Sequence, residues 1–193
     1  LDFEQVNFEG TLSDFLVRAK SVTPALGGNL NFRYQPAANK NPDAVDLSGD
    51  FHFYRMDVGR LSGLSFLGNG KLNGSYKGRW DEHGPTLQMK SKWDEFSINQ
   101  AIIQDISMDL MYENEQLNLL TTLEDRLMAG GCALNCDLND QFGFFSAKGQ
   151  LHIADLNALG FGMQAGIETL GFDFNLVHAQ QYQRSFSNFT LSD

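Results

Sequence analysis

Residues 106–123 read ISMDLMYENEQLNLLTTL, and this stretch carries the clearest structural pattern in the chain. Apolar residues occupy every second position from Ile106 to Tyr112, and leucines continue the alternation at positions 117, 119 and 123. Such a period of two is typical of half-buried β-strands. The polar tetrapeptide ENEQ at 113–116 separates the two runs and supplies a turn. The stretch therefore predicts an antiparallel hairpin with one apolar and one polar face.

The same alternation recurs on both sides of this hairpin and predicts about a dozen strands. Sixteen Phe against four Pro, with 42% hydrophobic residues, also fit a packed β-rich chain. No linker divides the chain, so we expect one elongated all-β segment over residues 1–193. The other clear runs of alternation lie at 30–34, 47–53, 132–138, 145–153 and 172–176.

Two stretches, 57–70 and 155–171, fit the strand pattern poorly and predict one or two short helical turns. In the second stretch, Leu156, Leu159, Met163, Ile167 and Leu170 have helical spacing. The two stretches also resemble each other, because DVGRL at 57–61 and DLNAL at 155–159 each follow a strand, 155 − 57 = 98 residues apart. A weak internal repeat around 45–61 and 145–159 is therefore a hypothesis.

Charge and motif content argue against several functions. The formal charge of −10 opposes binding to nucleic acid and to anionic lipid headgroups. No apolar run reaches the roughly 20 residues that span a bilayer. The sequence lacks a nucleophile elbow, a phosphate loop and a plausible set of metal ligands. We therefore expect no enzyme activity, no cofactor and no metal.

The two cysteines, Cys132 and Cys136, have the same strand parity as Leu134 and so face the apolar side. Four residues of strand separate them by about 13 Å, beyond the ~7 Å that a disulfide can span. We interpret both as free thiols in an apolar environment.

Four segments together resemble the TamB-like branch of the AsmA-like family of envelope proteins, of the translocation and assembly module type. The first is LSGDFHF at 47–53, which runs into MDVGRL at 56–61. The glycine-marked GNGKLNGS at 68–75 follows, and then FSINQAIIQDISMDL at 96–110, a short strand, a kink and an alternating strand. The span closes at 151–159, where a strand leads into Ala-Asp-Leu and a second Leu.

This resemblance implies an internal segment of a longer protein, folded as an elongated curved antiparallel sheet with a groove-like apolar face, a β-taco. A dozen strands at ~4.8 Å would stack to about 55 Å. It further implies a periplasmic location, an inner-membrane anchor outside this chain and an Omp85-like outer-membrane partner. The implied function is phospholipid transport between membranes or assembly of outer-membrane proteins.

Such a groove would hold phospholipid acyl chains or outer-membrane proteins without signature residues, because apolar burial alone supplies affinity. The alternative is that the same residues form the closed core of a β-sandwich. The candidate lining comprises Phe51, Phe53, Met108, Leu110, Leu119, Leu134, Leu151, Phe172 and Phe174.

A rival function is a β-sandwich module for carbohydrate binding or adhesion. In that case Tyr54, Trp80, Trp93 and Tyr182 would stack on sugar rings from the outer face. A purely structural spacer is a third possibility. In any of these cases, unprotected sheet edges favour self-association.

Overall fold

A computed structural model describes residues 4–11, 13–23, 25–37, 44–138, 144–161, 169–179 and 184–192. Apart from one helix, its regular elements are strands. In chain order they are β1 (Gln5–Thr11), β2 (Asp14–Val22), β3 (Leu26–Pro36), β4 (Val45–Asp57), α1 (Val58–Ser62), β5 (Leu67–Asp81), β6 (Gly84–Ile98), β7 (Ala101–Ile103), β8 (Ile106–Glu113), β9 (Gln116–Glu124), β10 (Met128–Asp137), β11 (Phe144–Ile153), β12 (Leu170–Ala179) and β13 (Arg184–Ser192).

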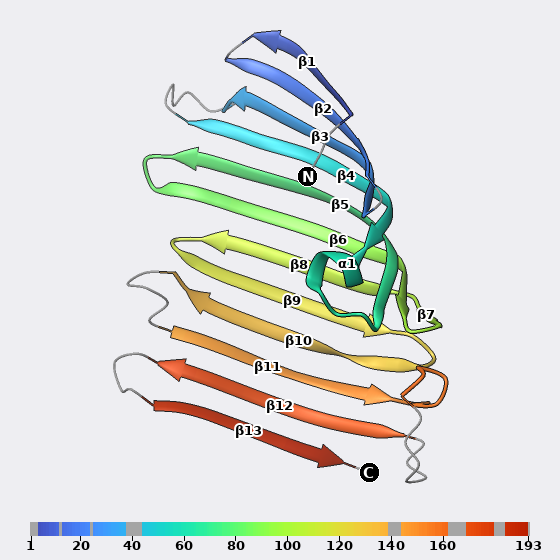
Figure 1. Cartoon of the computed structure of the whole chain (residues 1–193). Coiled ribbons are helices and arrows are strands. Elements are labelled where there is room, and N and C mark those ends of the chain that lie inside the picture. Colours follow the sequence, from blue (N-terminus) through green and yellow to red (C-terminus); the bar gives the residue numbers. More distant parts are fainter. Residues whose placement is uncertain are drawn as a thin grey trace.

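The strands form one antiparallel sheet in which each strand pairs with its neighbour in sequence (Figure 1). The order runs from β1 to β6, continues with β8, and ends at β13, while the short β7 pairs only with β6. This confirms the elongated, curved, open all-β fold. The alternative of a closed sandwich is wrong, because the described strands belong to a single sheet and no second sheet packs against it.

The hairpin predicted at 106–123 is confirmed as β8 and β9. Its two-residue loop consists of Asn114 and Glu115, whose φ angles are 50° and 61°. Positive φ at both loop residues is typical of a type I′ turn, whose twist matches that of the flanking strands. The connection between the end of β5 and the start of β6 is likewise tight, because Asp81 pairs with Gly84.

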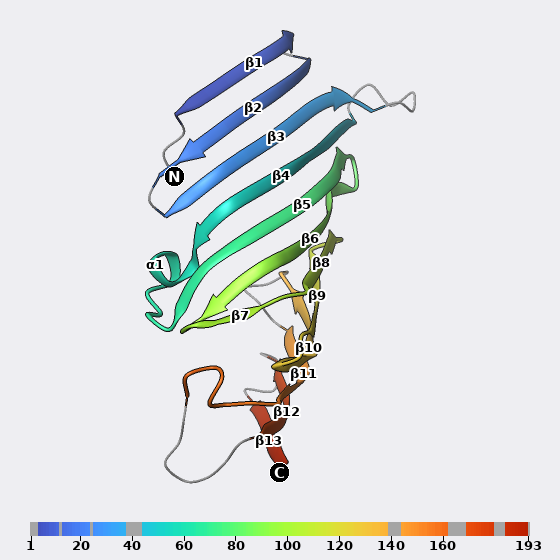
Figure 2. The same cartoon turned by 90° about the vertical axis from the view of Figure 1, so that its right-hand side faces the viewer.

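The sheet twists and curves along its length, so that the strands near the N-terminus are seen broadside where those near the C-terminus are seen edge-on (Figure 2). Irregular pairing occurs between β3 and β4, between β4 and β5, and between β5 and β6. All four register shifts lie toward the same end of these strands, the end from which α1 projects. Bulges of this kind bend a strand and increase its twist.

The two stretches that broke the strand pattern both begin with an aspartate cap. Asp57 Oδ1 accepts a hydrogen bond from the backbone N–H of Arg60 at 2.9 Å, and Asp155 Oδ1 accepts one from Ala158 N–H at 2.8 Å. The first stretch is helical over α1, as expected, but its last residues, from Leu67, belong to β5. The second forms turns rather than a helix over 156–160.

The prediction of a helix in the second stretch is therefore wrong for the residues that the structure describes. Residues 156–160 form turns, and Leu170 begins β12. Met163 and Ile167 lie outside the described residues. Among those described, no helix is long and apolar enough to cross a membrane.

The buried core is small and lies at one end of the strands. Ile103 is 1% exposed and Leu159 is fully buried, and they form a cluster with Ala101, Ile153 and Leu156. The turn segment after β11 thus packs across the strand ends, which also contribute Ile106, Leu123, Met128 and Leu170. The rest of the apolar side of the sheet has no comparable covering among the described residues.

A candidate apolar binding face

The strand register places the alternating apolar residues of β1 to β12 on one side of the sheet. Residues directly opposite each other on paired strands share a face. From β1 to β12, one row of such partners runs Phe8, Val17, Phe32, Gly49, Tyr76, Met89, Leu110, Leu119, Leu134, Ala147 and Leu176. We call the side of the sheet that carries Leu110 and all residues in register with it the apolar face.

All nine candidate lining residues lie on the apolar face, in three adjacent rows. Leu110, Leu119 and Leu134 share the row described above. The next row holds Phe51, Met108 and Phe174, and the one after it holds Phe53, Leu151 and Phe172. Each of the nine side chains is half-buried, shielded by its neighbours in the sheet rather than by a covering layer.

Several residues of the apolar face were missed from the sequence. Tyr76 and Met89 connect the predicted residues of β4 with those of β8. Trp93 also lies on this face, so the prediction that it stacks on sugars from the outer face is wrong. The alternation Leu87, Met89, Trp93 could have revealed this, but Ser91 interrupts it.

Aromatic rings on the apolar face lie over glycines of adjacent strands. A Cβ on Gly149 would stand 2.6 Å from the ring of Phe174, and one on Gly74 would collide with Phe51. Trp93 covers Gly70 in the same way, where a Cβ would meet the ring at 2.5 Å. These rings therefore reach over the adjacent strand and fill the space that a side chain at the glycine would occupy. Phe53 over Gly28 and Tyr76 over Gly49 repeat the arrangement.

The opposite side of the sheet, the polar face, carries the charged side chains. Its ion pairs include Arg79 with Asp46 at 2.9 Å and Lys71 with Glu95 at 2.7 Å. The hydrogen bond to Asp46 raises the pKa of Arg79. On the apolar face, burial and the nearby Asp50 carboxylate raise the pKa of Tyr76, whose hydroxyl donates to the Asn31 carbonyl at 2.9 Å.

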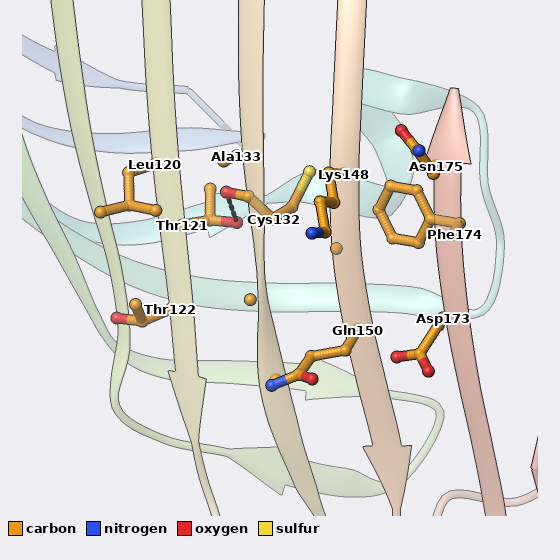
Figure 3. Close-up of a pocket in the computed structure, with 13 residues that line it drawn as sticks. Leu120, Thr121, Thr122, Cys132, Ala133, Lys148, Gln150, Asp173, Phe174 and Asn175 are labelled. Carbon is orange, nitrogen blue, oxygen red and sulfur yellow. Dashed lines mark hydrogen bonds between the residues drawn. The ribbon is translucent and has the colours of Figure 1, made fainter. Parts of the chain in front are cut away.

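Several shallow depressions lie on the polar face, and two of them are adjacent. One, of about 660 Å³, spans β9 to β12 between paired rows of outward side chains such as Lys148 and Gln150 (Figure 3). The other, of about 400 Å³, spans β6 to β10. They share Leu120 and Ala133, and their polar linings mix both charge signs. Among the described residues, no three His, Cys, Asp or Glu side chains are grouped to hold a metal.

The remaining aromatics of the carbohydrate hypothesis are scattered. Trp80 is 60% exposed at the end of β5, and Tyr54 lies against Gly27 on β3. Tyr182 lies outside the described residues. No shared sugar-binding platform results from the described members of the set.

The cysteines are placed as predicted. Cys132 and Cys136 are free, and both lie on the apolar face through their pairing with Thr121 and Leu117. Cys136 is buried.

Comparison with known proteins identifies no relative: no protein-family model, no curated protein and no solved structure matches this chain.

Proposed function

We propose that this chain is a non-enzymatic segment of an envelope-biogenesis protein and that its apolar face holds phospholipid acyl chains during transport between membranes. The observation that carries the proposal is the uninterrupted apolar face from β1 to β12, with a covering cluster at one end only. Monomeric soluble proteins rarely expose a contiguous apolar patch larger than a few hundred Å², and larger patches mark interaction sites.

The dimensions of this face suit acyl chains. Leu47 to Phe53 spans about 20 Å along one strand at ~3.3 Å per residue, whereas one leaflet of a bilayer core is about 15 Å thick. Ten spacings of ~4.8 Å from β1 to β12 give a face about 50 Å long. A chain of about 16 carbons that is fully shielded gains roughly 12 kcal/mol, at ~0.8 kcal/mol per methylene.

The location follows from the family resemblance: a periplasmic segment, an inner-membrane anchor elsewhere in the protein and an Omp85-like partner in the outer membrane. A second client class is favoured by the same surface. Nascent strands of outer-membrane proteins have one apolar face, and the open edge at β1 could pair with them.

Native mass spectrometry of the chain, purified from a bacterial host without detergent, tests the proposal. We expect co-purifying phospholipid, identified after organic extraction. Leu110→Asp together with Leu119→Asp should abolish it, because both charges lie on the apolar face. Phe53→Asp should act in the same direction.

The matched control is Met111→Asp together with Leu120→Asp. These residues are adjacent in sequence to the first pair, lie on the polar face and are 40% and 51% exposed. The control should keep the lipid, and circular dichroism should show folded protein for both pairs. A lipid-free wild-type protein that takes up no fluorescent acyl probe would exclude lipid carriage; capture of an unfolded outer-membrane protein instead would favour the second client class.

A further inference from the structure

Two segments far apart in sequence form a wall along one end of the sheet. The loop after α1 and the turn segment after β11 meet through Phe66 and Phe161, whose ring centroids are 6.0 Å apart in an edge-on arrangement. Asn99, in the turn after β6, joins both: its N–H donates to the Phe66 carbonyl at 2.6 Å, and its side-chain amide donates to the Leu159 carbonyl at 2.7 Å. Both segments project from the same side of the sheet (Figures 1 and 2).

The wall buries some of its large apolar side chains and exposes others. Leu156 and Leu159, 4% and 0% exposed, pack onto the strand ends of the apolar face. By contrast, four neighbouring apolar side chains face solvent: Leu61 is 56% exposed, Leu64 46%, Phe66 39% and Phe161 39%. We call these four residues the rim. Packing of the sheet accounts for the first pair but leaves the rim largely exposed, although Phe66 and Phe161 contact each other.

Charge at the rim differs from the rest of this acidic chain. Over 58–70 and 156–161 the only charged residue is Arg60, although the whole chain carries −10. The flanking Asp57 and Asp155 carboxylates accept backbone hydrogen bonds at the starts of their turns. Arg60 is exposed and forms no ion pair within the described part of the chain. Exposed Leu and Phe beside an unpaired Arg are suited to the boundary between lipid headgroups and acyl chains.

We propose that the rim inserts into a membrane surface, with Arg60 against lipid phosphate, so that acyl chains pass between the bilayer and the apolar face at this end of the sheet. The proposal rests on the proposed function, because it makes the wall the point of lipid entry or exit. The four rim residues are uncharged, and the neighbouring Arg60 supplies a positive charge for lipid phosphate.

Flotation with phosphatidylcholine vesicles tests membrane insertion. The wild-type chain should float with the vesicles, and Leu61→Asp with Leu64→Asp should reduce the bound fraction about tenfold or more, because charged side chains would enter the acyl boundary. Met111→Asp with Leu120→Asp is the matched control, since those leucine and methionine side chains are about as exposed but lie on the polar face. The control should float like the wild type, and circular dichroism should be the same for all three proteins.

A second measurement separates this inference from the proposed function. Uptake of a monomeric fluorescent fatty acid in the absence of vesicles needs only the apolar face, so the rim variant should retain it. The rim proposal is overturned if the wild-type chain takes up fatty acid but does not bind vesicles, or if the rim variant floats as well as the wild type. Either result is compatible with lipid carriage by the apolar face. If flotation depends on the rim but the chain takes up no fatty acid, membrane insertion is supported and lipid carriage is excluded.

Discussion

The side-chain amide of Asn99 donates a hydrogen bond of 2.7 Å to the backbone carbonyl of Leu159, sixty residues further along the chain. Asn99 has a φ of 50°, a left-handed conformation that Asn adopts more readily than most residues. One residue thus turns the chain after β6 and ties that turn to the segment that covers the strand ends of β8 to β12.

Asn99→Gly should keep the turn and lose the side-chain hydrogen bond. We expect a loss of about 1 kcal/mol in the free energy of unfolding, measured by urea denaturation. Asn99→Ala should cost about 1 to 2 kcal/mol more, because alanine resists positive φ. Equal stability of the glycine variant and the wild type would mean that the hydrogen bond does not hold the turn segment in place.

Leu159→Ala tests the small core directly. The side chain is fully buried, so its truncation should cost about 2 to 5 kcal/mol. Leu61 occupies the corresponding position of the first Asp-capped stretch but is 56% exposed, and Leu61→Ala should change stability by less than about 0.5 kcal/mol. Similar losses at both sites, in parallel urea titrations, would contradict the assignment of one leucine to the core and the other to the rim.

Gly70→Ala tests whether the Trp93 ring lies over the adjacent strand on the apolar face. The added methyl would meet the Trp93 ring at 2.5 Å, and the overpacking should cost about 1 to 3 kcal/mol. Trp93→Leu should relieve part of that cost, so a double-mutant cycle should give a coupling energy of at least about 0.5 kcal/mol. Additive effects of the two substitutions would show that the ring does not cover Gly70 in solution.

Tyr76 should contribute to a loss of stability in alkaline solution. Its pKa is raised, first by burial and then by Asp50, so the folded protein holds the phenol proton more tightly than the unfolded chain. The stabilisation is complete below the unfolded pKa of about 10 and is lost as pH rises through the higher folded value. Tyr76→Phe should weaken the fall in unfolding free energy above pH 10, measured by urea titrations at several pH values. An identical alkaline pH profile for the variant would contradict this assignment.

The open edge at β1 should support self-association, which we propose as a property of this segment. Every residue of β1 is exposed, and Phe8 is 54% exposed beside a free strand edge. Inward charge protects sheet edges from pairing, so Phe8→Lys should weaken the association that sedimentation equilibrium detects in the wild type. Trp80→Lys changes a similarly exposed aromatic at the end of β5, inside the sheet, and should leave association unchanged. A wild-type chain that is monomeric at high concentration would refute the prediction.

Much of the fold was predictable because a period of two is a local property. The alternation in 106–123 predicted β8, β9 and the turn between them, and the same alternation elsewhere in the chain placed the nine proposed lining residues on one face of the sheet. The weakest sequence signals lie in β5 and β6. There Gly74, Gly78 and Ser91 occupy apolar-face positions, so the apolar alternation lapses. At Gly74 the ring of Phe51, from the adjacent strand, fills the place of a side chain.

The sequence by itself determined that this chain is β-rich, which residues of each strand share a face, and that most of its charge lies opposite its large apolar side chains. Only the tertiary structure decided that one open sheet carries all of those faces in register and that the described residues form no second layer over them. Openness depends on pairing between strands and on bulges that set their twist, and neither is encoded in the period of a single strand. The meeting of Phe66 with Phe161 likewise required the fold, because contacts between distant turns follow from where the sheet places their strand ends.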